Sequence, residues 1–134
     1  MPVKAFTRPT SIQLTAATYA VNANETGTTF IATRASSTQV FTLPPIARNP
    51  AGLVYSFICG DAGGEIRVDP FNTSDTILAK TREDAGTSIV TNSTDIGIKN
   101  TASGNVIGDH ITLVSDGVSQ WYMLGESGAW AVHT

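Results

Sequence analysis

Residues 109–124, which read DHITLVSDGVSQWYML, carry the clearest structural signal in the chain. An alternating run over 109–114 is followed by Asp116-Gly117 and then by a second β-rich run over 119–124. An Asp-Gly pair between two such runs is typical of a two-residue type I′ turn. The stretch therefore predicts an antiparallel β-hairpin.

Outward from this hairpin, short strand-like runs are separated by turn-forming residues, as in β-sandwiches and barrels. The run LVYSFIC at 53–59 is mainly apolar on both faces, which predicts a central strand. Residues 65–69 alternate after the Gly-rich turn at 60–64, which predicts a second hairpin. Further strands are expected at 28–33, 39–43, 75–79, 88–90 and 95–99, with a last short strand from Trp130.

The composition points to the same fold class. Thr, Val and Ile make up 40 of the 134 residues, and β-branched side chains favour strands. We therefore predict an all-β protein, an antiparallel β-sandwich or β-barrel of about 8–10 short strands. Residues 1–24 contain two prolines and no acidic residue, which predicts an extended N-terminal arm, and residues 25–134 are expected to form a single β domain.

Charge and hydropathy exclude several classes of partner. Charged residues make up 14% of the chain and the net charge is −3, so the basic field that nucleic-acid binding needs is missing. No apolar run approaches the ~18 residues of a membrane span, and the N-terminus has no hydrophobic signal segment. We expect no nucleic acid and no membrane as partners. The single cysteine, Cys59, excludes an intrachain disulfide and indicates folding in a reducing cytoplasm.

The sequence offers no set of residues typical of a catalytic or metal site. Cys59 ends an apolar run without a basic neighbour, which predicts a buried, inert thiol. His110 and His133 belong to no spaced ligand motif. We expect no catalytic residue, no metal and no cofactor, and the chain is not expected to be an enzyme.

Two pairs of acids would approach one another if they faced each other across hairpins. They are Asp61 with Glu65, and Asp109 with Asp116. All four lie in turns or at strand ends, where acidic side chains commonly cap turns and keep edges soluble. A structural role is therefore predicted for them.

The order of several motifs resembles a module that recurs in tailed-bacteriophage virion proteins, in small capsid decoration proteins and in domains of tail fibres. The resemblance covers about residues 28–131 and rests on order, because each motif by itself is mostly hairpin sequence. The motifs are FTLPP at 41–45, GLVYSF at 52–57, GDHITLVSDG at 108–117, WY at 121–122 and GAW at 128–130.

The resemblance implies an all-β structural virion protein that forms a homotrimer and performs no catalysis. A complete chain of 134 residues favours a capsid decoration protein, since fibres are generally longer. Its expected partners are other copies of itself and the major capsid protein, and its expected location is the capsid surface of the virion after synthesis in the host bacterial cytoplasm. The expected contact residues lie in the arm and are Pro2, Lys4, Phe6, Arg8 and Pro9.

A second hypothesis is a short tail-fibre or receptor-binding domain that recognises saccharide on the host surface. Aromatic side chains stack on sugar rings, and Trp121, Tyr122 and Trp130 are the candidates. The same residues lie on predicted strands, so packing in the core is the competing interpretation. A small hydrolase has only isolated residues in its favour.

Overall fold

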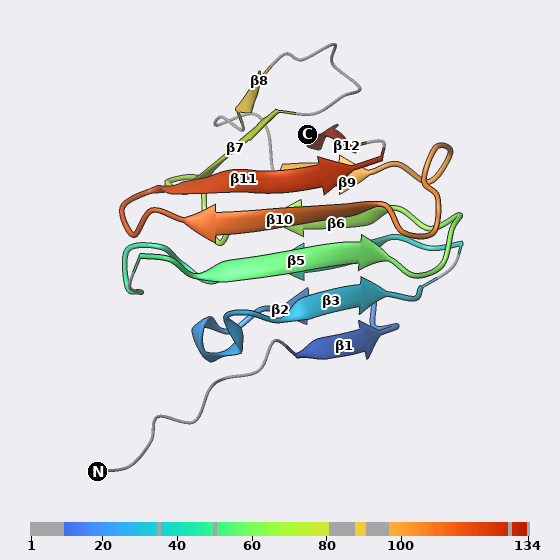
Figure 1. Ribbon diagram of the computed structural model, residues 1–134, viewed down its shortest axis with the longest axis horizontal. Coiled ribbons are helices and arrows are strands. Elements are labelled where there is room, and N and C mark those ends of the chain that lie inside the picture. The colour runs from blue at the N-terminus through green and yellow to red at the C-terminus, as the bar shows by residue number, and fades with distance from the viewer. Residues whose placement is uncertain are drawn as a thin grey trace.

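The computed structural model of the protein describes residues 10–34, 36–49, 51–80, 88–90, 97–128 and 130–133. Two β-sheets lie face to face and form a sandwich, which confirms the predicted all-β fold (Figure 1). The helical structure in these ranges is one 3-10 turn, η1 (Ala23–Glu25). No helix in them is long and apolar enough to cross a membrane.

The described strands number twelve rather than the expected eight to ten. The first sheet has seven strands in the order β1-β3-β5-β10-β11-β7-β8, and the second has five in the order β12-β9-β6-β4-β2. The strands of the seven-stranded sheet are β1 (Ser11–Leu14), β3 (Thr29–Ala32), β5 (Val54–Cys59), β10 (His110–Ser115), β11 (Gln120–Ser127), β7 (Thr76–Lys80) and β8 (Ser88–Val90). Those of the five-stranded sheet are β12 (Trp130–His133), β9 (Gly97–Asn100), β6 (Ile66–Asp69), β4 (Gln39–Thr42) and β2 (Thr18–Ala20).

The antiparallel pairing expected for the sandwich holds for half of its strand pairs. Five of the ten described strand pairs are parallel. Four of these five pairs arise because β1 to β6 alternate between the two sheets, so the chain winds around the sandwich; the fifth is β7 with β11. Neighbours within a sheet are then two strands apart in sequence and run in the same direction. The central position predicted for 53–59 is confirmed, since β5 lies between β3 and β10.

The same winding explains why the hairpin expected between residues 53–59 and 65–69 does not form. β5 belongs to the seven-stranded sheet and β6 to the five-stranded sheet, so residues 60–65 cross between them. The side chain of Asn105 holds this crossing, accepting a hydrogen bond from the Gly63 N–H at 2.9 Å and donating one to the Gly64 carbonyl at 2.6 Å.

The hairpin of β10 and β11 is confirmed, but its turn is longer than predicted. Four residues, 116–119, separate the two strands. The Asp116 carboxylate accepts hydrogen bonds from the backbone N–H groups of Val118, Ser119 and Gln120 at 2.8, 3.0 and 3.1 Å. Bonds from Gln120 and Val118 lower the pKa of Asp116. The carboxylate therefore closes a loop that the Asp-Gly pair alone does not define.

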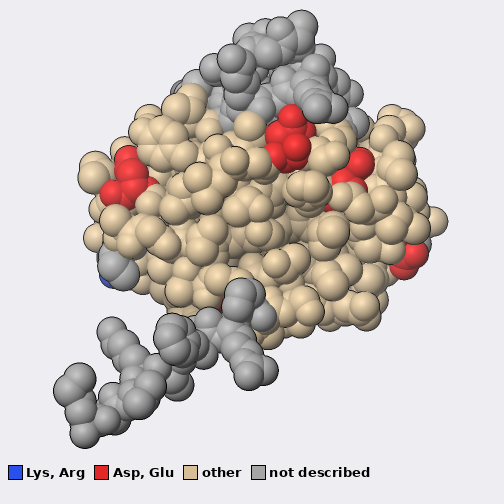
Figure 2. Space-filling view, viewed as in Figure 1, with Lys and Arg blue, Asp and Glu red and all other residues tan. Residues whose placement is uncertain are grey.

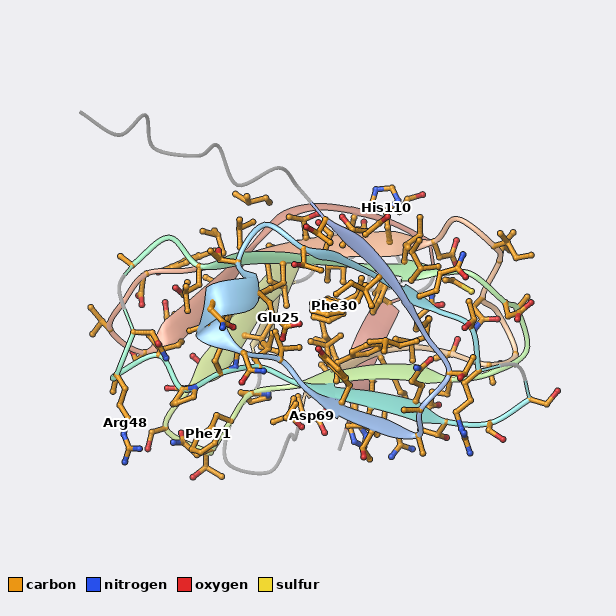
Figure 3. The ribbon with its side chains drawn as sticks, turned by 90° about the horizontal axis from the view of Figure 1, so that it is seen from below. Glu25, Phe30, Arg48, Asp69, Phe71 and His110 are labelled. Atoms are coloured by element: carbon orange, nitrogen blue, oxygen red, sulfur yellow. The ribbon has the colours of Figure 1, made fainter. Side chains whose placement is uncertain are left out.

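The predicted arm is shorter than residues 1–24. β1 and β2 form the edge strands of the two sheets, and Figure 3 shows these blue strands passing from one sheet to the other. Ile12, Leu14 and Tyr19 pack against the core, which explains why this segment is ordered with the domain. Residues 1–9 lie outside the described part of the chain.

Aromatic side chains from both sheets meet in the core. Phe57 of β5 stacks on Phe30 of β3 with ring centroids 5.5 Å apart, and it contacts Phe41 of β4 in the opposite sheet at 5.1 Å. The ring centroid of Tyr19 of β2 lies 5.4 Å from that of Phe30. These contacts join the two sheets and fix which face of each strand points inward.

Candidate functional site

The structure separates the three aromatic residues proposed to bind saccharide. Trp121 and Trp130 are fully buried, with Trp121 packed against Tyr55 at a centroid distance of 5.9 Å. Tyr122 is 38% exposed, and its hydroxyl donates to the Gln120 side chain at 2.6 Å. The two indoles therefore belong to the core, and the three rings do not share one stacking surface. The predicted contact residues Pro2, Lys4, Phe6, Arg8 and Pro9 lie outside the described residues.

The candidate nucleophile and the exposed histidine are each isolated. Cys59 is buried as predicted, its Sγ–H donates to the Asp61 carbonyl at 3.4 Å, and burial raises the pKa of its thiol. His110 is exposed, with Nδ1 3.0 Å from the Gly108 carbonyl oxygen. The described residues contain no group of three or more His, Cys, Asp or Glu side chains placed to hold a metal ion.

The remaining titratable candidates have structural surroundings. His133 is buried with Nε2 4.0 Å from Asp69 Oδ1, and desolvation lowers its pKa. Asp109 precedes β10 and Asp116 follows it, so this pair sits at opposite ends of one strand. Asp109 and Asp116 therefore do not face each other across the hairpin. Glu65 contacts Arg67 Nε at 2.5 Å.

Five neighbouring strands of the seven-stranded sheet, β1, β3, β5, β10 and β11, are almost free of charged residues. β1, β3, β5 and β10 contain no Asp, Glu, Lys or Arg, and β11 contains Glu126 alone. Figure 2 shows their outer face as a broad uncharged surface with acidic groups near its margins. We call the outer surface of these five strands the uncharged face, because it has no outward Asp, Glu, Lys or Arg. It is formed by the outward side chains Thr29, Ile31, Val54, Ser56, Ile58, Thr112, Val114 and Tyr122, together with the exposed Leu124 and the exposed His110.

Strand register arranges these side chains in rows across the sheet. Val54, Val114 and Tyr122 lie opposite one another on β5, β10 and β11 and form an apolar row. A second row is made of hydroxyl side chains, in which Ser56 and Thr112 share a hydrogen bond of 2.8 Å. Hydroxyl groups that already hydrogen-bond to one another lose few hydrogen bonds to water when another protein covers them. Covering this row therefore costs little free energy.

The outer face of the five-stranded sheet differs sharply. Arg67 of β6 lies opposite Lys99 of β9, and Asp69 follows on the same strand. The fold thus places Arg67, Asp69 and Lys99 on the five-stranded sheet and leaves β1, β3, β5 and β10 of the other sheet without Asp, Glu, Lys or Arg. A broad neutral face of mixed apolar and hydroxyl groups suits contact with another protein, because no ion has to leave water.

The sequence shows which runs lack charged residues, but its overall composition does not show that these runs lie together on one face. The strand runs at 54–59 and 110–115 have no Asp, Glu, Lys or Arg at any position, outward ones included. Their common location became visible only with the sheet order. Comparison with protein-family models and with curated proteins gives no match for this chain.

Proposed function

We propose that this chain is a structural virion protein that decorates and stabilises a bacteriophage capsid through protein–protein contacts, without catalysis. The observation that supports this proposal most strongly is the uncharged face. It spans several strands of the seven-stranded sheet, and it includes Leu124, which is 65% exposed. Exposed apolar side chains on an uncharged surface are typical of a contact with another protein.

The mechanism is stabilisation by mass action. Copies that bind the expanded capsid shell, but not its precursor, shift the equilibrium toward the expanded state. The uncharged face contacts the major capsid protein, and the copies associate with one another as a homotrimer at symmetry axes of the shell. No chemical step is required of any side chain.

Purified protein mixed with expanded, undecorated heads tests the proposal. We expect the protein to sediment with expanded heads and not with unexpanded ones. Failure to sediment with expanded heads at any salt concentration would contradict the proposal. Binding to a host glycan array in place of heads would favour the receptor-binding hypothesis instead.

A further inference from the structure

A pocket lies where three parallel strands of the five-stranded sheet end together. Ala20 of β2 is in register with Thr42 of β4, which is in register with Asp69 of β6. Because the three strands stop at the same level, the segments that follow them form the walls of a pocket of about 280 Å³. Its lining is mainly apolar and includes Val21, Leu43, Pro44, Pro45 and Phe71.

Phe71 is the most conspicuous residue of this pocket. Its side chain is 54% exposed, and in Figure 3 it lies at the outer side of the sandwich, near Arg48. A cavity of about 150 Å³ accommodates benzene in another protein, so the present pocket has room for a phenyl ring. The Leu43-Pro44-Pro45 segment thus does more than end β4, since it builds a wall of the pocket.

The pocket adjoins a strand edge with free hydrogen-bonding groups. Val40 N donates to the Ala17 carbonyl at 2.9 Å, and Val21 N donates to the Thr42 carbonyl at 2.8 Å. This parallel pattern directs the N–H and C=O groups of Thr18 and Ala20 away from β4. An edge of this kind accepts an added strand, and an adjacent pocket can hold one of its side chains.

We propose that residues 2–9 of a second copy of this chain bind here, with Val3–Arg8 alongside β2 and the Phe6 ring in the pocket. The inference rests on the self-association in the proposed function. Val3–Arg8 contains no proline, so each of its residues keeps a backbone N–H for strand pairing. Phe6 is its single aromatic residue.

Charge favours the same occupant. Residues 2–9 carry Lys4 and Arg8 and no acid, whereas the side chains that the structure describes include eight Asp and Glu and four Lys and Arg. Glu25 stands beside the pocket, because its Oε1 accepts a hydrogen bond of 2.9 Å from the N–H of Asn22, a lining residue. A basic strand therefore meets an acidic body.

Geometry argues for a second copy over the chain's own segment. Thr10 is fixed in the seven-stranded sheet, where its carbonyl accepts a hydrogen bond of 2.7 Å from Thr29 N. The edge of β2 belongs to the other sheet, and packed sheets lie about 10 Å apart. If Val3–Arg8 of the same chain paired with β2, only two residue steps would connect Arg8 to Thr10, and each step spans at most about 3.6 Å. Two steps are shorter than the distance of about 10 Å between the sheets.

Disulfide trapping between full-length chains tests this proposal. A Phe6→Cys chain is mixed with a Phe71→Cys chain and oxidised, and non-reducing gels measure the cross-linked dimer that contains both chains. The matched control pairs Phe6→Cys with Ile107→Cys, because Ile107 is 64% exposed in the loop before β10. Native Cys59 is buried in every chain.

We expect about ten-fold more mixed dimer with Phe71→Cys than with Ile107→Cys, since docking raises the effective concentration of the two thiols to about millimolar. Equal yields would overturn the proposal. An intramolecular disulfide in the Phe6→Cys/Phe71→Cys chain, without mixed dimer, would overturn it in favour of the chain's own segment. Neither failure bears on capsid binding, which the sedimentation experiment measures separately.

Discussion

Gly128 and Gly108 share a φ of +100° but differ in what surrounds their α-carbons. A Cβ at Gly128 would fall on the carboxyl group of Asp109, whereas a Cβ at Gly108 would meet nothing within 4 Å. The Asp109 carboxylate has no easy alternative position. It is buried and accepts hydrogen bonds from Asn100 Nδ2 at 3.1 Å and from Val106 N at 2.9 Å.

We therefore expect Gly108→Ala to lower the free energy of unfolding by about 1–2 kcal/mol, through backbone strain alone. Gly128→Ala should cost at least about 2 kcal/mol more, because it also displaces a buried, hydrogen-bonded carboxylate. Urea unfolding of the two variants measures the difference. Equal losses would show that Asp109 is free to move.

Burial of His133 makes the stability of the fold depend on pH. Desolvation, followed by the charge of Arg67, lowers the pKa of His133 below its usual 6.5. The unfolded chain then takes up this proton more readily than the folded one. Stability from His133 is fully present above pH 6.5 and is lost as the pH falls through the lowered pKa. Burial raises the pKa of Asp69, so its contribution is present below pH 3.8 and is lost as the pH rises.

Between pH 7 and 5.5 we expect the free energy of unfolding to decrease on acidification, with a slope of at most about 1.4 kcal/mol per pH unit for this one proton. His133→Asn should flatten the curve in that window. Chemical denaturation at a series of pH values provides the measurement. An unchanged slope in the variant would assign the effect to another group.

At the level of strands, positions were predictable and partners were not. The runs at 39–43 and 53–59 predicted β4 and β5 because alternation and breakers are local properties. Alternation says which side chains are buried but not which strand lies alongside. Since β1 to β6 change sheet at every step, assuming that consecutive strands pair gave a false hairpin at β5 and β6.

The arm was predicted to end at residue 24, but β1 already begins at Ser11, for a related reason. Residues 11–20 form two short strands with little pattern of their own, and they gain stability from parallel pairing with β3 and β4. Their role was thus invisible until those neighbours were placed. Pro2 and Pro9, which suggested an arm, both precede the first described residue, Thr10.

Two truncations separate the arm from the edge strands. Deleting residues 2–9 should leave Tm unchanged at concentrations that keep the chain monomeric, because β1 begins at Ser11. Deleting residues 2–20 removes β1 and β2, uncovers the edges of β3 and β4, and strips Tyr19 from Phe30. Burying one large apolar side chain completely contributes about 1.5–3 kcal/mol, so the joint loss of the partly buried Ile12, Leu14 and Tyr19 should cost at least about 2 kcal/mol. Differential scanning calorimetry compares them, and equal Tm values would contradict the edge-strand assignment.

For the whole molecule, the sequence shows that charged residues are scarce but not which face lacks them. The sheet order brings together β1, β3, β5 and β10, which contain no Asp, Glu, Lys or Arg, while Arg67, Asp69 and Lys99 lie on the other sheet. The alternation of side chains along a strand decides which aromatic residues are buried. Trp121 points inward from β11 and Tyr122 outward, so neighbours in sequence belong to the core and to the surface.

Placing one positive charge on the uncharged face tests its role in capsid binding. Tyr122→Lys should weaken binding to expanded heads at least about ten-fold, because an unpaired ammonium would have to leave water at the contact, and ten-fold corresponds to about 1.4 kcal/mol. Tyr122 is 38% exposed and its hydroxyl donates to the Gln120 side chain on the same strand, so the fold should tolerate the change. Ser103→Lys adds the same charge in an exposed turn and should bind as the native chain does. Equal weakening by both variants would indicate a general effect of net charge, and no weakening by Tyr122→Lys would move the contact to another face.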